Sequence, residues 1–126
     1  MNLSQLLSEW IKKIEEENPP AANIAAINFS MFSSDKGYMV YVTGAEVYDP
    51  DDDDWAGEID YQPARKNKYI LLPREFTSGL KWKGVLDMVG NSIKELAGTD
   101  PARILFNGRV VTAGFDDSEL MMIKGE

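Results

Sequence analysis

The spacing of the apolar residues changes along this chain from the period of a helix to the period of a strand, and this change limits which folds are possible. The first apolar residues recur three and four positions apart, which predicts an amphipathic helix over residues 3–17. Asn2 is placed to cap this helix, and Pro19 and Pro20 end it because proline cannot donate the next hydrogen bond. The apolar positions are Leu3, Leu6, Leu7, Trp10, Ile11 and Ile14.

Strand patterns follow the first helix. Residues 24–32 alternate between apolar and polar side chains, which is the period of a strand with one buried face. A polar connection that ends in Gly37 leads to a second strand at 38–47, so the two strands are predicted to form an antiparallel hairpin. Residues 68–73 form a third, short apolar strand pattern.

Helical spacing returns at residues 80–96, where Ser78 and Gly98 are placed to cap the second helix. Three further strands are predicted at 103–106, 110–115 and 119–124, with turn signals at Asn107-Gly108 and Asp116-Asp117-Ser118. This order predicts one α+β domain over residues 1–126, in which an antiparallel sheet of about five strands packs against a single layer of two helices. The side chains expected to be buried are Leu7, Trp10, Ile14, Ile27, Phe29, Val40, Val42, Ile70, Val85, Leu86, Val89, Val111 and Ile123.

Two residue types are missing from the composition. The 126 residues include no cysteine and no histidine. Disulfides, thiolate nucleophiles, the usual zinc and haem sites and imidazole-based acid–base catalysis are therefore excluded. We expect no cofactor, no metal and no enzymatic activity.

The net charge restricts the partners. The chain carries 13 basic and 21 acidic residues, a formal charge of −8, which repels nucleic-acid phosphates and anionic membranes. The longest apolar runs, at 38–42 and 69–72, are far shorter than the ~20 residues of a membrane-spanning helix. From the charge and the short apolar runs, we expect no nucleic-acid partner and no membrane partner. The first residues lack the basic and apolar regions of a signal peptide, so we expect a cytoplasmic location.

The excess negative charge is local. Residues 46–60 contain eight acidic residues and no basic one. The chain before Pro63 has 3 basic and 13 acidic residues, whereas the chain after it has 10 basic and 8 acidic residues. Such crowding of carboxylates destabilises the native state unless Arg65, Lys66 and Lys68, a cation or a basic partner compensates for it.

Three interpretations of this segment stay open. Asp49, Asp51, Asp53 and Asp60 fall at positions 1, 3, 5 and 12 of the calcium-loop pattern, but position 6 is Asp54 instead of glycine. The second interpretation is a solvated loop without a ligand.

The third interpretation is a surface that recognises a basic protein, because aromatic residues are interleaved with the carboxylates. Two roles are open for Trp55, since it can face the partner or fold inward and pin the loop to the sheet, and both can be true. The candidate partner-binding residues are Tyr48, Asp49, Asp51, Asp52, Asp53, Asp54, Trp55, Glu58 and Asp60.

Catalytic patterns are weak. Ser33 and Lys36 have the Ser-x-x-Lys spacing but are predicted to lie in a hairpin turn, and we interpret this as coincidence. Glu58 and Asp60 could form a pair of the kind used by glycosidases, yet no pattern indicates a cleft around them.

Two segments and the helix between them resemble small bacterial immunity proteins, which are encoded beside polymorphic or contact-dependent toxins. The first segment, Tyr48-Asp49-Pro50-Asp51-Asp52-Asp53-Asp54-Trp55-Ala56, is similar to an acidic run that ends in Asp-Trp-Ala after a strand. The second, Val111-Thr112-Ala113-Gly114-Phe115-Asp116-Asp117-Ser118-Glu119-Leu120, looks like a strand followed by a Gly-Phe-x-Asp-Gly-Asp turn. Ser118 and Glu119 replace the glycine and the second acid of that turn. The helix at 82–96 matches in order and length.

The resemblance implies a single-domain α+β protein that binds and neutralises a cognate toxin without catalysis. Our leading hypothesis is therefore an immunity-type inhibitor whose acidic surface covers a basic toxin domain. The alternative is a small-ligand or calcium-binding domain that uses the loop from Asp49 to Asp60.

Overall fold

Helix α1 (Leu3–Glu17) begins at the predicted residue in the computed structural model, which describes residues 2–100, 103–116 and 118–125. The side chain of Asn2 accepts a hydrogen bond from Gln5 N (2.8 Å), and Asn2 N donates to the side chain of Gln5 (3.0 Å). These reciprocal bonds satisfy two N–H groups that have no partner within the helix. The helix ends at Glu17, as predicted, and Asn18 is its C-cap before the two prolines.

The sheet has five strands in the order β3-β2-β1-β4-β5. Strands β1 (Ala26–Ser34) and β2 (Gly37–Ala45) form the predicted antiparallel hairpin, with β3 (Tyr69–Leu71) antiparallel to β2. Strands β4 (Val110–Phe115) and β5 (Met121–Lys124) also pair antiparallel. The α+β class and the strand number are confirmed.

Strands β1 and β4 pair in parallel, so the sheet is mixed although mostly antiparallel. Parallel strands need a long crossover, which is usually a helix. Strands β3 and β4 also run in the same direction, with β2 and β1 between them in the sheet. Helix α4 (Trp82–Thr99) forms the crossover from β3 to β4.

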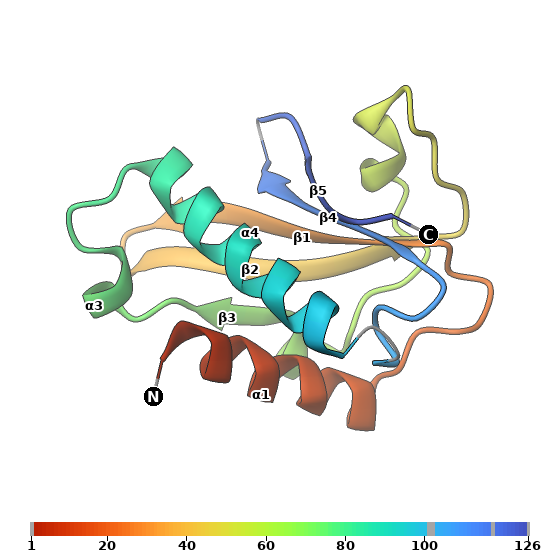
Figure 1. Cartoon of the computed structure of the whole chain (residues 1–126), viewed down its shortest axis with the longest axis horizontal. Helices are drawn as coiled ribbons and strands as arrows, with labels where there is room; N and C mark the ends of the chain where they lie inside the picture. The colour runs from red at the N-terminus through yellow and green to blue at the C-terminus, as the bar shows by residue number, and fades with distance from the viewer. Residues whose placement is uncertain (1, 101–102, 117, 126) are drawn as a thin grey trace.

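Helices α1 and α4 lie side by side across one face of the sheet (Figure 1). The main core is formed between these helices and the strand residues that face them, and the predicted buried residues belong to it. The exception is Ile70, which is only half-buried because β3 is a short edge strand. The confirmed core positions are Leu7, Trp10, Ile14, Ile27, Phe29, Val40, Val42, Val85, Leu86, Val89, Val111 and Ile123.

The predicted strand at 103–106 is wrong, because this segment forms successive turns. Two arginines bind the segment between α4 and β4 to the rest of the fold through hydrogen bonds. Arg103 donates to Glu15 Oε1 of α1 at 2.9 Å. Arg109 donates to the carbonyl oxygens of Ile24 (2.9 Å), Ile104 (2.6 Å) and Ala21 (3.0 Å). These side chains bond the segment to α1 and to the link before β1, and Leu105 and Phe106 fill the core from a turn.

The predicted caps of the second helix are also wrong. Ser78 is the C-cap of the short helix α3 (Arg74–Thr77), and Lys81 is the N-cap of α4. Gly98 lies inside α4, which ends at Asp100. Asp117, which belongs to a predicted turn, lies outside the described residues.

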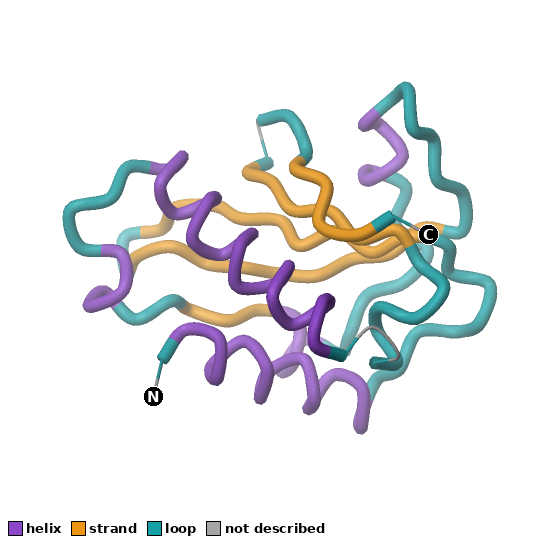
Figure 2. The backbone as a smooth tube through the Cα atoms, in the orientation of Figure 1, coloured by secondary structure: helices purple, strands orange, loops and turns teal. Residues whose placement is uncertain are grey.

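The chain between β2 and β3 contains a 3-10 turn, η1 (Asp53–Gly57), and the short helix α2 (Arg65–Lys68). Figure 2 shows this segment as a long loop interrupted by these turns. In the described part of the chain, no helix is both long and apolar enough to cross a membrane.

Candidate functional site

The face of the sheet opposite α1 and α4 carries the acidic loop, which we define as residues 46–60. Side chains alternate along a strand, so the residues next to the core positions point to this open face. At one end they are small and apolar, namely Ala26, Ala45 and Val110. Further along β1 they are polar, so the open face offers both an apolar anchoring point and a hydrogen-bonding floor.

Trp55 packs on the apolar end of this face. Its side chain is 6% exposed and contacts Ala26, Ala45 and Val110. The half-buried Tyr48 meets it edge to face, with ring centroids 5.3 Å apart. Trp55 therefore takes the inward position, and its ring anchors the loop to the sheet.

The two ends of the acidic loop are joined. Gly44 N donates to Tyr61 O at 2.8 Å, and Tyr61 N donates back to Gly44 O at 3.1 Å. Within this neck Glu46 N donates to Asp60 Oδ2 at 2.9 Å. The approach requires glycine, because a Cβ at Gly44 would lie 2.8 Å from Ile24 Cγ2 and 3.1 Å from the Tyr61 ring.

Three of the predicted carboxylates also bind backbone N–H groups. Asp49 accepts from Asp51 N and Asp52 accepts from Asp54 N, both at 2.9 Å, and the second of these bonds caps η1. Asp53 Oδ2 accepts from Leu120 N, just before β5, at 3.2 Å. Together with Asp60, these residues hold the shape of the loop while their side chains remain exposed.

The carboxylates of Asp51, Asp54 and Glu58 are exposed, and within the described residues no hydrogen bond or ion pair engages them. The three ion pairs of the described chain lie elsewhere, between Lys12 and Glu16, Lys66 and Glu17, and Arg103 and Glu15. The downstream cations that we considered as compensating charges do not pair with the acidic loop: Lys66 binds Glu17, and Lys68 donates to Gln62.

The floor of the open face is a chain of buried polar groups. Thr112 Oγ1 donates to Asn28 Oδ1 at 2.9 Å, and Asn28 Nδ2 donates to Ser30 Oγ at 2.8 Å. All three side chains are buried. The parallel register places Asn28 directly opposite Thr112, so this network links β1 to β4.

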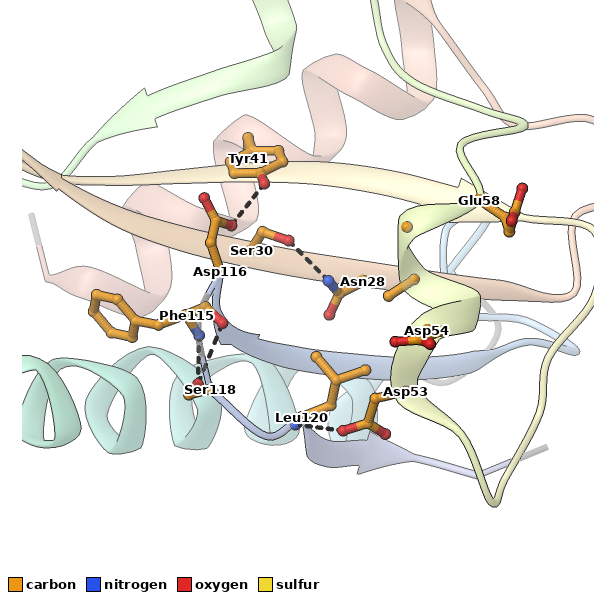
Figure 3. Close-up of a pocket in the computed structure, with 12 residues that line it drawn as sticks. Asn28, Ser30, Tyr41, Asp53, Asp54, Glu58, Phe115, Asp116, Ser118 and Leu120 are labelled. Atoms are coloured by element: carbon orange, nitrogen blue, oxygen red, sulfur yellow. Dashed lines mark hydrogen bonds between the residues drawn. The ribbon is translucent and has the colours of Figure 1, made fainter.

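A hollow of about 600 Å³ lies over this floor, between η1 and the turn after β4 (Figure 3). Asp53, Asp54 and Glu58 border it on the loop side, and Asp116 and Ser118 border it on the other. A smaller hollow of about 220 Å³ lies between Val47 and the carboxylates of Asp49, Asp52, Asp54 and Glu58. The structure thus brings most of the predicted acidic residues to two neighbouring hollows.

Tyr41 and Asp116 complete the rim of the large hollow. Tyr41 OH donates to Asp116 Oδ1 at 2.7 Å. Burial, together with this bond to a carboxylate, raises the pKa of Tyr41 to about 12. The phenol therefore stays protonated above the pH at which an ordinary tyrosine ionises.

The turn after β4 carries the departure from the immunity-protein pattern. The hydroxyl of Ser118 accepts a hydrogen bond from Phe115 N at 3.1 Å. Ser118 therefore closes the turn with its side chain, at the position where the resembled pattern has glycine.

Sequence reasoning missed Asn28, Ser30, Tyr41 and Asp116 as site residues. Part of the signal was present, since Asn28 and Ser30 are polar residues in the alternating strand pattern, but local spacing does not show that both are buried at the floor of a hollow. Asp49, Asp53 and Asp60, to which the calcium interpretation assigned metal-binding positions, each accept a backbone hydrogen bond. No group of three or more acidic side chains suited to a metal ion occurs within residues 2–100, 103–116 and 118–125.

Comparison of the chain with protein-family models, with curated proteins and with solved structures finds no significant match.

Proposed function

We propose that this chain is a non-catalytic binding domain that holds a basic protein through its acidic loop. The observation that carries the proposal is that Asp51, Asp54 and Glu58 present negative charge that no ion pair among the described residues engages, on a loop that is fixed at several points. Crowded carboxylates repel one another, and a basic surface would relieve that repulsion on binding. A loop held in shape before binding also has less conformational entropy to lose.

Exposed apolar groups beside the carboxylates support a protein partner. Val47 and Ile59, near the two ends of the loop, are 73% and 52% exposed. Interfaces combine such apolar contact area with a charged rim that steers association. A charged surface with apolar residues at its border fits a protein better than a free cation.

The expected resemblance to immunity proteins indicates which class of protein the partner belongs to. We propose that the partner is a basic toxin domain, which this chain inhibits by covering its active surface. A cytoplasmic location fits an inhibitor that protects the cell in which it is made.

The test is a pull-down that identifies the protein partner, followed by surface plasmon resonance against that partner at several salt concentrations. Long-range attraction is screened over ~8 Å at physiological salt, so the association rate should fall as salt rises. The variant Asp54→Asn with Glu58→Gln should associate more slowly. Glu9→Gln with Glu16→Gln, which removes the same charge from the outer face of α1, is the matched control. A salt-independent association rate that the first variant does not change would contradict the proposal.

The polar hollow gives a second candidate, a small organic cation, because Asp54, Glu58 and Asp116 border it. A ligand that binds only the folded chain must raise the melting temperature. A melt with and without millimolar putrescine tests this candidate, and Asp54→Asn should abolish any increase.

A further inference from the structure

A second part of the open face carries an aromatic strip, which we define as Phe32, Met39, Tyr41, Tyr69 and Leu71. The register of the strands places them together, since Met39 lies opposite Leu71 and Tyr41 lies opposite Tyr69, while Phe32 of β1 lies opposite Met39. Residues directly opposite each other in adjacent strands project to the same face. The strip is therefore on the face that α1 and α4 leave open.

The rings of the strip pack on one another at the surface of the protein. The centroid distances are 5.8 Å between Phe32 and Tyr41, 6.3 Å between Phe32 and Tyr69, and 5.6 Å between Tyr41 and Tyr69. Even so, Tyr69 is 40% exposed and Leu71 is 41% exposed. A hollow of about 600 Å³ lies beside Phe32, Met39 and Tyr69, so the strip offers both apolar surface and room for an inserted side chain.

Positive charge borders this hollow. Lys68 and Arg65 line it together with Gln62 and Pro63. Lys68 Nζ lies 5.5 Å from the centroid of the Tyr41 ring and 5.3 Å from that of Tyr69, within the range of a cation–π interaction. Within the described chain neither Lys68 nor Arg65 forms an ion pair with a carboxylate.

We propose that the aromatic strip docks an aromatic side chain of the protein partner that stands next to a carboxylate. The ring fits against Phe32 and Tyr69, where edge-to-face packing is favourable, and the carboxylate is attracted by Lys68 and Arg65. This inference rests on the proposed function and adds a second contact to it, with a charge opposite to that of the acidic loop.

Tyr41 joins the two parts of the surface. Its ring lies in the strip beside Lys68, and its hydroxyl donates to Asp116 at the rim of the acidic hollow. A partner that crosses the open face would therefore meet negative charge at one end and positive charge at the other. Such a charge pattern favours a partner with complementary charges and favours one orientation of that partner.

The test titrates the whole chain with three probes of matched shape, followed by NMR. Phenylacetate carries a carboxylate, 2-phenylacetamide is neutral and phenethylammonium is a cation. All three should shift the ring resonances of Tyr41 and Tyr69, and phenylacetate should bind most tightly. Lys68→Gln should weaken phenylacetate binding about two- to fivefold, the size expected for an exposed ion pair, without affecting the amide. Tyr69→Ala should weaken all three.

Lys94→Gln, an exposed change on α4, is the control for Lys68→Gln, and the dispersion of each spectrum reports whether the variant is folded. Binding with no preference for the carboxylate, shifts that avoid Tyr69, or no binding at all would overturn the inference. Glu58→Gln should leave phenylacetate binding unchanged. Failure here therefore stays distinct from failure of the acidic loop to bind a basic partner, which the association experiment measures.

Discussion

Asp53 and Leu120, which are far apart in the sequence, are joined by a hydrogen bond from Leu120 N to Asp53 Oδ2 at 3.2 Å. This bond fastens η1 of the acidic loop to the residue just before β5. The two segments on which we based the expected resemblance to immunity proteins therefore meet on the open face. The hydrogen bond also distinguishes Asp53, which holds the shape of the loop, from its neighbour Asp54, whose carboxylate borders both hollows.

This separation gives the first prediction. Asp53→Ala removes the acceptor for Leu120 N and should lower the free energy of unfolding by about 1 kcal/mol. Asp54→Ala makes the same chemical change in the same turn without removing a hydrogen bond of its side chain, and should leave stability unchanged or raise it slightly because repulsion falls. Urea denaturation of both variants decides the matter. Equal destabilisation would contradict the division into shape-holding and free carboxylates.

The second prediction concerns the anchor of the loop. Trp55→Ala removes a buried ring from Ala26, Ala45 and Val110 and should lower the free energy of unfolding by about 3–5 kcal/mol. Trp82→Ala is the matched control, since Trp82 is 49% exposed and packs mainly on Phe115. Urea denaturation of the two variants should show a clearly larger loss for Trp55. A loss no larger than that of the control would mean that the loop does not depend on this ring.

Periodicity predicted the elements that bury one face, and it failed where a side chain far away in the sequence decides the structure. Residues 3–17 show this success, because an apolar stripe is a property of the segment itself. Residues 103–106 show the failure, because their apolar pattern suits a strand but Arg103 and Arg109 hold the segment in turns through α1 and residues 21–24. The parallel pairing of β1 with β4 likewise follows from the path of α4, which local spacing does not encode.

The third prediction tests the polar floor. Asn28→Ala leaves the buried hydroxyl of Thr112 without its acceptor and should lower the free energy of unfolding by about 1–3 kcal/mol. Thr112→Val removes the other partner. In a double-mutant cycle the two changes should couple by about 1 kcal/mol, because the second costs less once the first is made. Additive effects would show that the bond contributes nothing to stability.

The fourth prediction concerns Arg109, whose burial lowers the pKa of the guanidinium. The desolvation is offset by the three backbone carbonyl oxygens that it binds. Arg109→Met keeps much of the side-chain volume but leaves these carbonyls without a donor, and should lower the free energy of unfolding by about 3 kcal/mol or more. Arg65→Met, at an exposed position, should be near neutral. Chemical denaturation measures both, and similar values would refute the bridging role.

The candidate site was predictable only in part. The acidic composition of residues 46–60 pointed to the loop, since eight carboxylates without a cation are visible in the sequence. Its partners on the sheet were not, because Asn28 and Tyr41 acquire their roles from the register of β1, β2 and β4. Trp55 was assigned two orientations, and only the small side chains of Ala26 and Ala45 beneath it explain why it lies inward.

The last prediction uses the phenol of Tyr41. Its folded-state pKa of about 12 lies above the ordinary value of 10.0, so folding favours the neutral phenol. The resulting stabilisation is fully present below the unfolded pKa and is lost as the pH rises from about 10 to about 12. Absorbance titration of wild type minus Tyr41→Phe should therefore show one phenol ionising near pH 12. Asp116→Asn should lower that midpoint but keep it above 10, because burial is the larger cause and the carboxylate the smaller one. A difference curve centred near pH 10 would show that Tyr41 neither is buried nor donates to Asp116 in solution, and the link between the acidic hollow and the aromatic strip would then be absent.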